Sequence, residues 1–252
     1  MPPAAVHAVI TAGGRVDDAF AAAIGTPWKA LAPIGNRRLI DAAIDAARGA
    51  GVAEIAVVGP ADVQAYCASR VDLAIPAVAD GAENIRRALH AFPRAERLVF
   101  LTSDLPFIEA FGLSDFIERS FGAQLAMALA QGAAYDDAFP AAPPHFVDIG
   151  GERIANGSVF TIDVRAIPTI EAVAGRFFAA RKSLLKLASL LGPELCVRFA
   201  FKRLRIRHIE ARADRMLGLK ALAVRHAAPG LCFDVDDIAD WAYAHAFARS
   251  GR

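Results

Sequence analysis

The sequence predicts an α/β protein built on a mostly parallel β-sheet, and two observations lead to this fold class. Through the first half of the chain, apolar runs of strand length alternate with longer segments whose apolar residues recur at helical spacing. Glycine and proline cluster where one kind of segment gives way to the other. Strands that alternate with helices of this length are typical of parallel sheets with right-handed crossovers.

The elements of the first half follow from this pattern. The predicted strands are Val6 to Thr11, Glu54 to Gly59, Leu73 to Val78 and Arg97 to Thr102. The predicted helices are Arg38 to Ala50, Asp62 to Arg70 with Asp62 as its cap, and Asp80 to Phe92. The pair Gly13-Gly14 and the carboxylate Asp104 each follow a predicted strand. Because ligands of such sheets bind beyond the carboxyl ends of the strands, we expect both to belong to one site.

The second half is less regular. Its predicted elements begin with a strand at Gln124 to Ala130, a loop at Tyr135 to Pro144, and a hairpin of Pro144 to Ile149 with Ile154 to Ile162 around Gly150-Gly151. They continue with a mainly helical stretch, Arg176 to Arg215, broken at Gly192-Pro193, then strands at Ala221 to Arg225 and Leu231 to Val235, and a closing helix at Asp237 to Ala248. Since no linker interrupts this order, we expect a single domain over residues 1–252, with a basic helical insertion at about 176–220.

Composition narrows the class of protein. Hydrophobic residues make up 55% of the 252 residues, yet no apolar run approaches the roughly 20 residues that span a bilayer. The segment before the first strand has neither a basic region nor a cleavage site, so we expect a soluble protein of the cytoplasm. The three cysteines, Cys67, Cys196 and Cys232, lie far apart, which favours a packing role over a disulfide framework or a zinc cluster.

Charge is unevenly distributed, although the net charge is only +1. The stretch from Arg176 to Arg225 holds thirteen Lys or Arg and only three acids, a local charge of about +10. Such a charge attracts phosphorylated substrates, acidic lipids or nucleic acid, while the simpler interpretation is a solvated surface. Leu184, Leu187 and Leu191 recur at helical spacing beside Arg181, Lys182 and Lys186, which indicates a basic amphipathic helix.

The first candidate site element is the loop Thr11-Ala12-Gly13-Gly14-Arg15, followed by Lys29. Glycines after a strand let backbone N–H groups approach phosphates, and an Arg and a Lys nearby can neutralise the charge of a transferring phosphoryl group. The loop is neither G-x-G-x-x-G nor followed by G-K-[ST], so the usual dinucleotide and P-loop interpretations fail. A plain tight turn with surface Arg and Lys is the alternative.

Carboxylates form the second and third candidate elements. Asp104 follows the strand that ends at Thr102, and Pro106 fixes the turn that presents it, as suits a ligand of Mg²⁺ or the cap of a following helix. In an extended chain Asp234 and Asp236 point to one side while Asp237 begins the last helix, so one carboxylate can face the site and another can cap. Taken with Asp104, this pattern favours a metal role for Asp236.

The fourth element is Asn156-Gly157, before the apolar strand residues Val159 and Phe160. It either presents an amide to a substrate or forms a turn.

In this order the elements resemble the MobA-like NTP transferases, the molybdenum-cofactor guanylyl- and cytidylyltransferase-like nucleotidyltransferases of the glycosyltransferase-A type fold. The matching motifs are the A-G-G loop at Ala12 to Gly14, P-x-K-x-L at Pro27 to Leu31, G-x-x-x-L-I at Gly35 to Ile40, D-x-P at Asp104 to Pro106, N-G at Asn156-Gly157, and D-[IV]-D-x-x-x-D-[LW] at Asp234 to Trp241. The resemblance covers nearly the whole chain and implies a Rossmann-like three-layer α/β/α sandwich with a mostly parallel mixed sheet, of the nucleotide-diphospho-sugar transferase type.

The resemblance also implies an activity and a set of site residues. Ala12, Gly13 and Gly14 would cradle a nucleoside triphosphate, Arg15 and Lys29 would contact its phosphates, Asp104 with Asp236 would hold Mg²⁺, and Asn156 would face the acceptor. The implied reaction moves a nucleoside monophosphate from an NTP, with CTP or GTP favoured, to a phosphorylated or phosphonate acceptor and releases pyrophosphate.

The expected partners are thus an NTP and an acidic acceptor, either a small molecule or a lipid-linked one, and no nucleic acid. The basic amphipathic stretch adds an expectation of peripheral contact with a membrane. Two other functions stay open. One is a sugar transferase of the same fold, because Asp234-Val235-Asp236 is also a D-x-D motif, and the other is a nucleotide-binding protein without catalysis.

Overall fold

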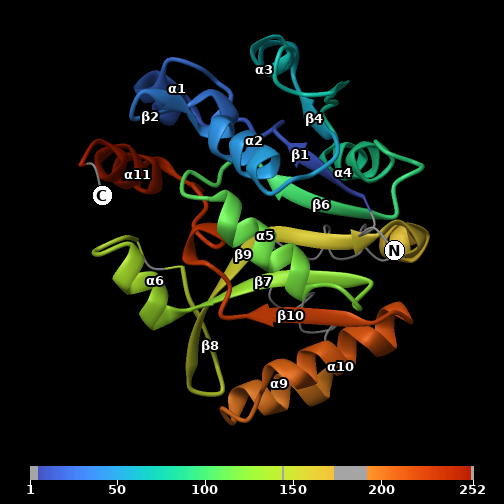
Figure 1. Cartoon of the computed structure of the whole chain (residues 1–252). Coiled ribbons are helices and arrows are strands. Elements are labelled where there is room, and N and C mark those ends of the chain that lie inside the picture. The colour runs from blue at the N-terminus through green and yellow to red at the C-terminus, as the bar shows by residue number, and fades with distance from the viewer. Residues whose placement is uncertain (1–4, 144, 173–191, 251–252) are drawn as a thin grey trace.

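One mixed sheet runs through the computed structural model, which describes residues 5–143, 145–172 and 192–250. Its main path is β10-β7-β9-β6-β1-β4-β5, and β8 pairs with β9 (Figure 1). The strands are β1 Val6–Thr11, β4 Ile55–Gly59, β5 Leu73–Pro76, β6 Arg97–Thr102, β7 Leu125–Gln131, β8 Val147–Ile149, β9 Glu152–Asp163 and β10 Ala221–Arg225. On the main path only β9 is antiparallel to its neighbours, so the predicted mostly parallel mixed sheet is confirmed.

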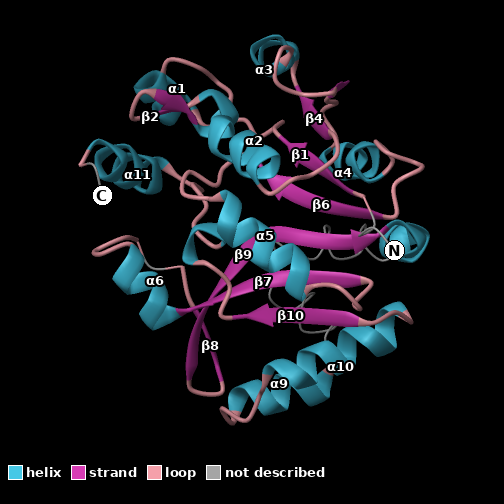
Figure 2. Cartoon of the chain, in the orientation of Figure 1, coloured by secondary structure: helices cyan, strands magenta, loops and turns pink. Residues whose placement is uncertain are grey.

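Helices line both faces of this sheet (Figure 2). They are α1 Asp18–Ile24, α2 Leu39–Gly49, α3 Ala61–Cys67, α4 Gly81–Leu89, α5 Ala110–Arg119, α6 Gly132–Ala138, α9 Pro193–Ala200, α10 Ile206–Leu217 and α11 Ile238–Arg249. A separate two-stranded ribbon, β2 Pro33–Ile34 with β3 Arg37–Arg38, leads into α2. No described helix is long and apolar enough to cross a membrane.

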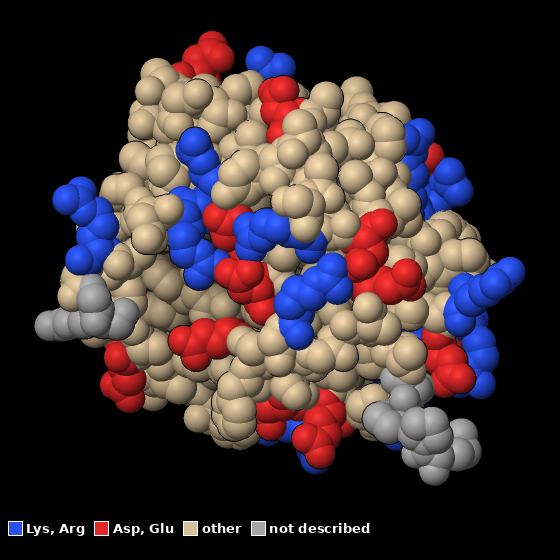
Figure 3. All heavy atoms as spheres, turned by 45° about the horizontal axis from the view of Figure 1, so that its top comes forward, with Lys and Arg blue, Asp and Glu red and all other residues tan. Residues whose placement is uncertain are grey.

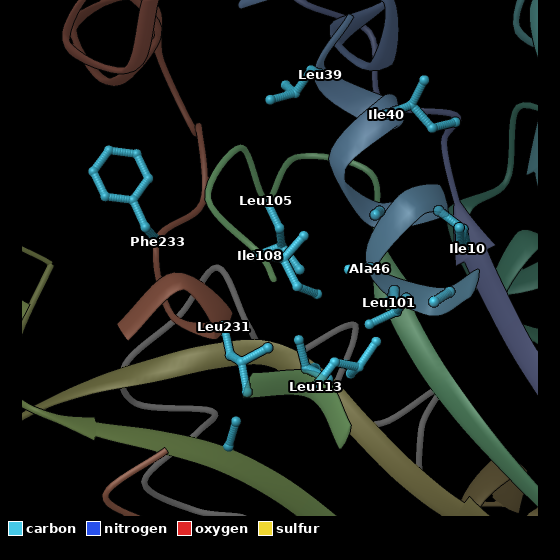
Figure 4. Packing of buried hydrophobic residues seen from close by; sticks show 14 of the residues in the cluster. Ile10, Leu39, Ile40, Ala46, Leu101, Leu105, Ile108, Leu113, Leu231 and Phe233 are labelled. Atoms are coloured by element: carbon cyan, nitrogen blue, oxygen red, sulfur yellow. The ribbon is translucent and has the colours of Figure 1, made fainter. Parts of the chain in front are cut away.

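Alternation along β1 divides the core into two layers. Ala8 and Ile10 point into the larger cluster, whereas Val9 points into a smaller one on the opposite face. Period-2 alternation with both faces apolar is what a central strand of a covered parallel sheet requires. Figure 4 shows the larger cluster, where Ile10 and Leu101 of neighbouring strands lie beneath α2. This burial fixes the strand ends from which the candidate loops emerge.

Several predicted elements need correction. The predicted loop at Tyr135 to Pro144 begins inside α6, because Tyr135 is buried among Phe139, Phe146 and Phe233. The predicted strand at Leu231 to Val235 is instead a 3₁₀ turn, Pro229–Leu231, followed by irregular chain. A strand needs a row of backbone hydrogen bonds to a neighbouring strand. Here a single backbone hydrogen bond, from the Val235 N–H to the Asp104 carbonyl at 2.9 Å, joins the segment to the loop after β6.

Other differences concern caps and helices. The predicted cap of α3, Asp62, is wrong, because the capping residue is Pro60. The Asp62 carboxylate instead accepts a hydrogen bond from the Trp28 indole at 3.0 Å. Helices α1 and α5 were not predicted. The predicted hairpin around Gly150-Gly151 is confirmed by the β8 and β9 pairing. The apolar and basic positions predicted between 176 and 191 lie outside the described residues.

Gly230 offers a test of how the acidic C-terminal loop is held. A Cβ at this position would lie 2.0 Å from the Phe107 carbonyl oxygen, a backbone atom that cannot move aside. We expect Gly230→Ala to lower the free energy of unfolding by about 1–3 kcal/mol, as overpacked substitutions do. Urea unfolding followed by circular dichroism measures this, and an unchanged midpoint would show that the turn is free to shift.

Candidate active site

Three loops meet beyond the carboxyl ends of β1 and β6. The loop after β1 carries Gly13 and Gly14, and the Gly14 carbonyl accepts the backbone N–H of Lys29 at 3.0 Å. The loop after β6 carries Asp104, whose carbonyl accepts the N–H of Val235. These backbone bonds bring three of the sequence-predicted elements together although they lie far apart in the chain.

Lys29 and Asp104 form the centre of this site. The Lys29 Nζ lies 2.5 Å from Asp104 Oδ2 and 3.7 Å from Asp236 Oδ1. Burial alone would lower the pKa of Lys29, but the carboxylates of Asp104, Asp236 and Asp234 outweigh it and raise that pKa above its ordinary value. The ammonium is therefore held charged among carboxylates.

Asp104 is buried and incompletely satisfied. It is 8% exposed, and its Oδ1 has no hydrogen-bond partner among the described residues. It is not a helix cap, since α5 begins at Ala110 after the capping residue Glu109. A buried carboxylate oxygen without a partner is costly unless a ligand or ion completes it. The residues thus fit a divalent cation held by Asp104 with the more exposed Asp236, although no group of three potential ligands gathers in the described parts of the chain.

Asp234 was predicted to face the same side as Asp236, and its environment is distinctive. Burial, then the charges of Asp236 and Asp104, raise the pKa of Asp234 to about 6. Its Oδ2 accepts a hydrogen bond from the Ser158 hydroxyl at 3.0 Å. Ser158 belongs to β9, so the central antiparallel strand also contributes a side chain to this carboxylate cluster.

A buried carboxylate orients the acidic loop: Asp240, the third aspartate of the motif at Asp234 to Trp241, to which the sequence analysis gave no role. Asp240 is fully buried, and its Oδ2 accepts the N–H groups of Asp236 at 2.9 Å and Asp237 at 3.1 Å. Its Oδ1 contacts His145 Nε2 at 2.8 Å. Burial would lower the pKa of His145, but the hydrogen bond and charge of Asp240 raise it overall. The signal was in the sequence, since an acid three residues after Asp237 has capping-box spacing.

Asp237 caps α11, as predicted. Its side chain accepts the N–H groups of Ala239 and Asp240. One aspartate of the motif therefore caps the helix while Asp236 is directed toward Lys29.

The glycine loop lies directly beside Lys29. A Cβ at Gly14 would lie 3.5 Å from Lys29 Cε, and one at Gly13 would lie 3.6 Å from Asn84 Nδ2. The N–H of Ala12 is engaged by the Val58 carbonyl at 2.8 Å, so Gly13 and Gly14 are the better candidates to donate to a phosphate.

Arg15 and Asn156 stand apart from the contacts described so far. Arg15 is exposed, and its guanidinium lies 5.9 Å from the centre of the Trp28 ring rather than among the carboxylates. Asn156 is exposed within β9, so the alternative that Asn156-Gly157 forms a turn is wrong; the turn is at Gly150-Gly151. Gly157 permits close contact there, since a Cβ would lie 2.6 Å from the Leu231 carbonyl oxygen.

One hollow among the described residues lies apart from these carboxylates. A pocket of about 680 Å³ lies between the β2 and β3 ribbon, the start of α2 and the end of α11. Its lining includes Pro106 but none of the four site residues Lys29, Asp104, Asp234 and Asp236. We therefore define the candidate site by the contacts of Lys29 with Asp104 and Asp236 and not by this pocket.

Comparison with solved structures defines the fold class. A hypothetical transferase from Thermus thermophilus aligns with a TM-score of 0.84 and 25% identity over 94% of this chain and 99% of that one. A CMP:2-keto-3-deoxy-manno-octonic acid synthetase complexed with CTP aligns at 0.59 and 15% identity over 98% and 100%. Rv0371c from Mycobacterium tuberculosis, in complex with manganese, aligns at 0.52 and 18% over 96% and 98%. The chain therefore has the three-layer fold of the nucleotide-diphospho-sugar transferase type.

The family follows from the sequence itself. The model of the MobA-like NTP transferase domain matches residues 8–194, so this chain belongs to that family, as the motif order predicted. No curated protein matches the sequence.

The raised pKa of Asp234 gives a test of the site's electrostatics. A folded-state pKa of about 6 means that ionising Asp234 opposes folding above that pH, whereas the penalty disappears as the pH falls toward 4. Without divalent cations, we expect Asp234→Asn to raise the free energy of unfolding at pH 7.5 by about 1–3 kcal/mol and to change little at pH 4. Urea unfolding at the two pH values, with Asp237→Asn as a matched control, decides this; destabilisation at pH 7.5 would contradict it.

Proposed function

We propose that this protein is a magnesium-dependent nucleotidyltransferase that transfers a nucleoside monophosphate from an NTP to a phosphorylated or phosphonate acceptor and releases pyrophosphate. The observation that carries the proposal is the contact of the Lys29 ammonium with Asp104 and Asp236, directly beside Gly14 of the glycine loop. Family membership supports the transferase class, and the finer assignment rests on this geometry.

The reaction needs no protein nucleophile. An acceptor oxygen attacks the α-phosphorus in line with the departing pyrophosphate, so catalysis consists of positioning and charge stabilisation. Gly13 and Gly14 would donate backbone N–H groups to the triphosphate, and Lys29 would stabilise the charge that develops on the α-phosphate. Bound Mg²⁺, held by Asp104 and Asp236, would neutralise phosphate charge and orient the reacting oxygens.

Asp240 would act as a positioning residue in this scheme. Its hydrogen bonds to the backbone of Asp236 and Asp237 fix the direction of the loop. Arg15, exposed next to Trp28, is proposed as a phosphate contact only, and Asn156 as a residue that faces the acceptor.

CTP and GTP are the proposed donors. The solved structure of the CMP:2-keto-3-deoxy-manno-octonic acid synthetase holds CTP, which supports a pyrimidine donor by fold likeness. Manganese in Rv0371c supports a divalent metal without selecting magnesium. We propose a phosphorylated or phosphonate acceptor, in keeping with membership of the family, and a location in the cytoplasm.

The two alternative functions make different predictions at the same site. A sugar transferase would use the two carboxylates of Asp234-Val235-Asp236 as a pair of metal ligands. Asp234, however, is half-buried and accepts a hydrogen bond from Ser158, which favours a supporting role. A binding protein without catalysis would bind an NTP and release no pyrophosphate.

The proposal is tested first by ligand binding and then by turnover. Thermal unfolding with each of the four NTPs and Mg²⁺ identifies the donor, because a ligand at 100 times its Kd adds about 2.7 kcal/mol to stability. Pyrophosphate release is then measured with that NTP and a panel of phosphorylated and phosphonate acceptors. Stabilisation without pyrophosphate release from any acceptor would favour the binding protein, and release of a nucleoside diphosphate from an NDP-sugar would favour the sugar transferase.

Lys29→Ala tests the central cation. We expect turnover to fall by roughly a hundredfold, since losing one preformed contact to developing charge costs about 3 kcal/mol. Pyrophosphate release is compared with that of Lys220→Ala, an exposed lysine on the segment before β10. Near-normal turnover of a folded Lys29→Ala protein would contradict the assignment.

Asp104→Asn and Asp236→Asn test the proposed metal ligands. A neutral amide is a poorer ligand for a hard cation, so half-maximal activity should require at least about tenfold more Mg²⁺ in each variant. Asp237→Asn is the matched control, because asparagine is an equally good helix cap. If the Mg²⁺ titrations of both test variants overlay that of the parent, these aspartates do not bind the metal.

A further inference from the structure

The last turn of α9 exposes a group of large apolar side chains. Val197 and Phe199 are each 55% exposed, and Phe201, the capping residue of this helix, is 71% exposed. Val197 and Phe201 are four residues apart and lie on the same side of the helix, whereas Phe199 points to another side. The end of the helix is thus apolar on two sides.

This apolar tip is not a loosely attached piece of core. Leu195 and Leu204, on either side of it, are only 4% and 7% exposed and anchor the segment. Arg205 donates to the Gly150 carbonyl at 2.6 Å, and a Cβ at Gly150 would clash with the Leu204 carbonyl oxygen, so the hairpin of β8 and β9 packs tightly on the junction of α9 and α10. Figure 1 shows this junction at the lower end of the molecule.

Helix α10 fixes the junction to the sheet. The carboxylates of Glu210 and Asp214 accept the backbone N–H groups of Ala223 and Ala221 in β10, at 2.9 Å and 2.6 Å. The tip is therefore presented by a well-supported element rather than by a free loop.

Mainly cations accompany the apolar side chains in sequence; the acid Glu194, in the first turn of α9, pairs with Arg198 at 3.1 Å. The stretch Leu195 to His208 contains five Lys or Arg and no Asp or Glu. On the face that Figure 3 shows, by contrast, acidic and basic side chains are intermixed. Arg205, Arg207 and Arg225 also line a pocket of about 260 Å³ beside the hairpin, where Glu152 pairs with Arg225. Cations that flank exposed aromatic residues match an interface with anionic headgroups outside and acyl chains within.

From these observations we infer that the tip formed by Val197, Phe199 and Phe201, with Lys202, Arg203, Arg205 and Arg207, binds peripherally to the surface of an anionic lipid membrane. Two phenylalanines and a valine enter the acyl boundary, and the cations contact lipid phosphates. The group combines an aliphatic residue with two phenylalanines that point to different sides of the helix. This favours lipid over nucleic acid, whose bases need flat stacking platforms in a cationic groove.

Membrane binding would bring the enzyme to a lipid-linked acceptor. That extension alone rests on the proposed function, whereas membrane binding itself needs neither nucleotide nor turnover. A vesicle assay without NTP therefore separates a failure of this inference from a failure of the proposed function.

The experiment is flotation of the whole chain with vesicles of phosphatidylcholine and phosphatidylglycerol, compared with phosphatidylcholine alone. We expect binding to the anionic vesicles only, and weaker binding as salt screens the headgroup charge. The double variant Phe199→Ala with Phe201→Ala should lower the partition coefficient at least about tenfold, because it removes two buried aromatic contacts. Phe111→Ala, at a position 85% exposed on α5, is the matched control and should bind like the parent.

Charge is tested in the same assay. Arg203→Glu should also lower the partition coefficient at least about tenfold, while Arg94→Glu, an exposed arginine in the turn before β6, should change it little. Circular dichroism melting of each variant checks that it is folded. Absence of flotation with anionic vesicles at low salt overturns the inference, as does equal loss in test and control variants. Binding of a homopolymer RNA without vesicle flotation overturns it in favour of a nucleic-acid surface.

Discussion

Asp104 joins the site in two ways, through its backbone and through its side chain. Its carbonyl accepts the N–H of Val235, which holds the acidic C-terminal loop against the end of β6, and its carboxylate contacts the ammonium of Lys29. Lys29 in turn is bonded through its backbone to the glycine loop. The chain segments around residues 14, 104 and 235 thus meet at one aspartate, and the arrangement depends on the buried parallel pair of β1 and β6 that places it.

Three carboxylates gather around one lysine, and their mutual repulsion is partly balanced by neighbouring groups. Asp104, Asp234 and Asp236 repel one another, and the raised pKa of Asp234 reflects this repulsion together with burial. Lys29 offsets part of the repulsion, and the Ser158 hydroxyl satisfies one oxygen of Asp234. Perturbed electrostatics of this kind are common at functional sites, and a bound cation would relieve the repulsion.

The second half of the chain supplies both the supporting residues and the inferred membrane surface. Strand β9 runs antiparallel between β6 and β7 and carries Ser158, which donates to Asp234. The turn that joins β8 to β9 contacts Arg205 through the Gly150 carbonyl. The same element therefore connects the proposed catalytic centre to the basic, apolar tip of α9. Because both contacts involve this one hairpin, an enzyme bound to a membrane through the tip would hold its site at a fixed distance from the membrane surface.

The sequence by itself determined the alternating fold, the strand ends and the residue types that could carry phosphate chemistry. Strands β1, β6 and β10 were predicted with their observed bounds. The largely buried β1 and β6 are apolar runs between clear breakers, and the edge strand β10 is a shorter apolar run that ends at Arg225. Asp104 was found because it follows such a strand, whereas Lys29 and the Asp234 to Asp237 group were found from short local motifs in the sequence.

Tertiary structure alone decided which of these groups meet. Local pattern favoured a strand at Leu231 to Val235, yet packing of Phe233 in an aromatic cluster and a single bond to Asp104 made it an irregular chain. It also showed that Asp240 and His145 orient the acidic loop, that Arg15 lies over Trp28, and that apolar residues of α9 face solvent. The periodicity of apolar residues indicates which residues share a face of one helix or strand. Contacts between elements depend on how segments distant in sequence pack together, and a local sequence pattern does not contain this information.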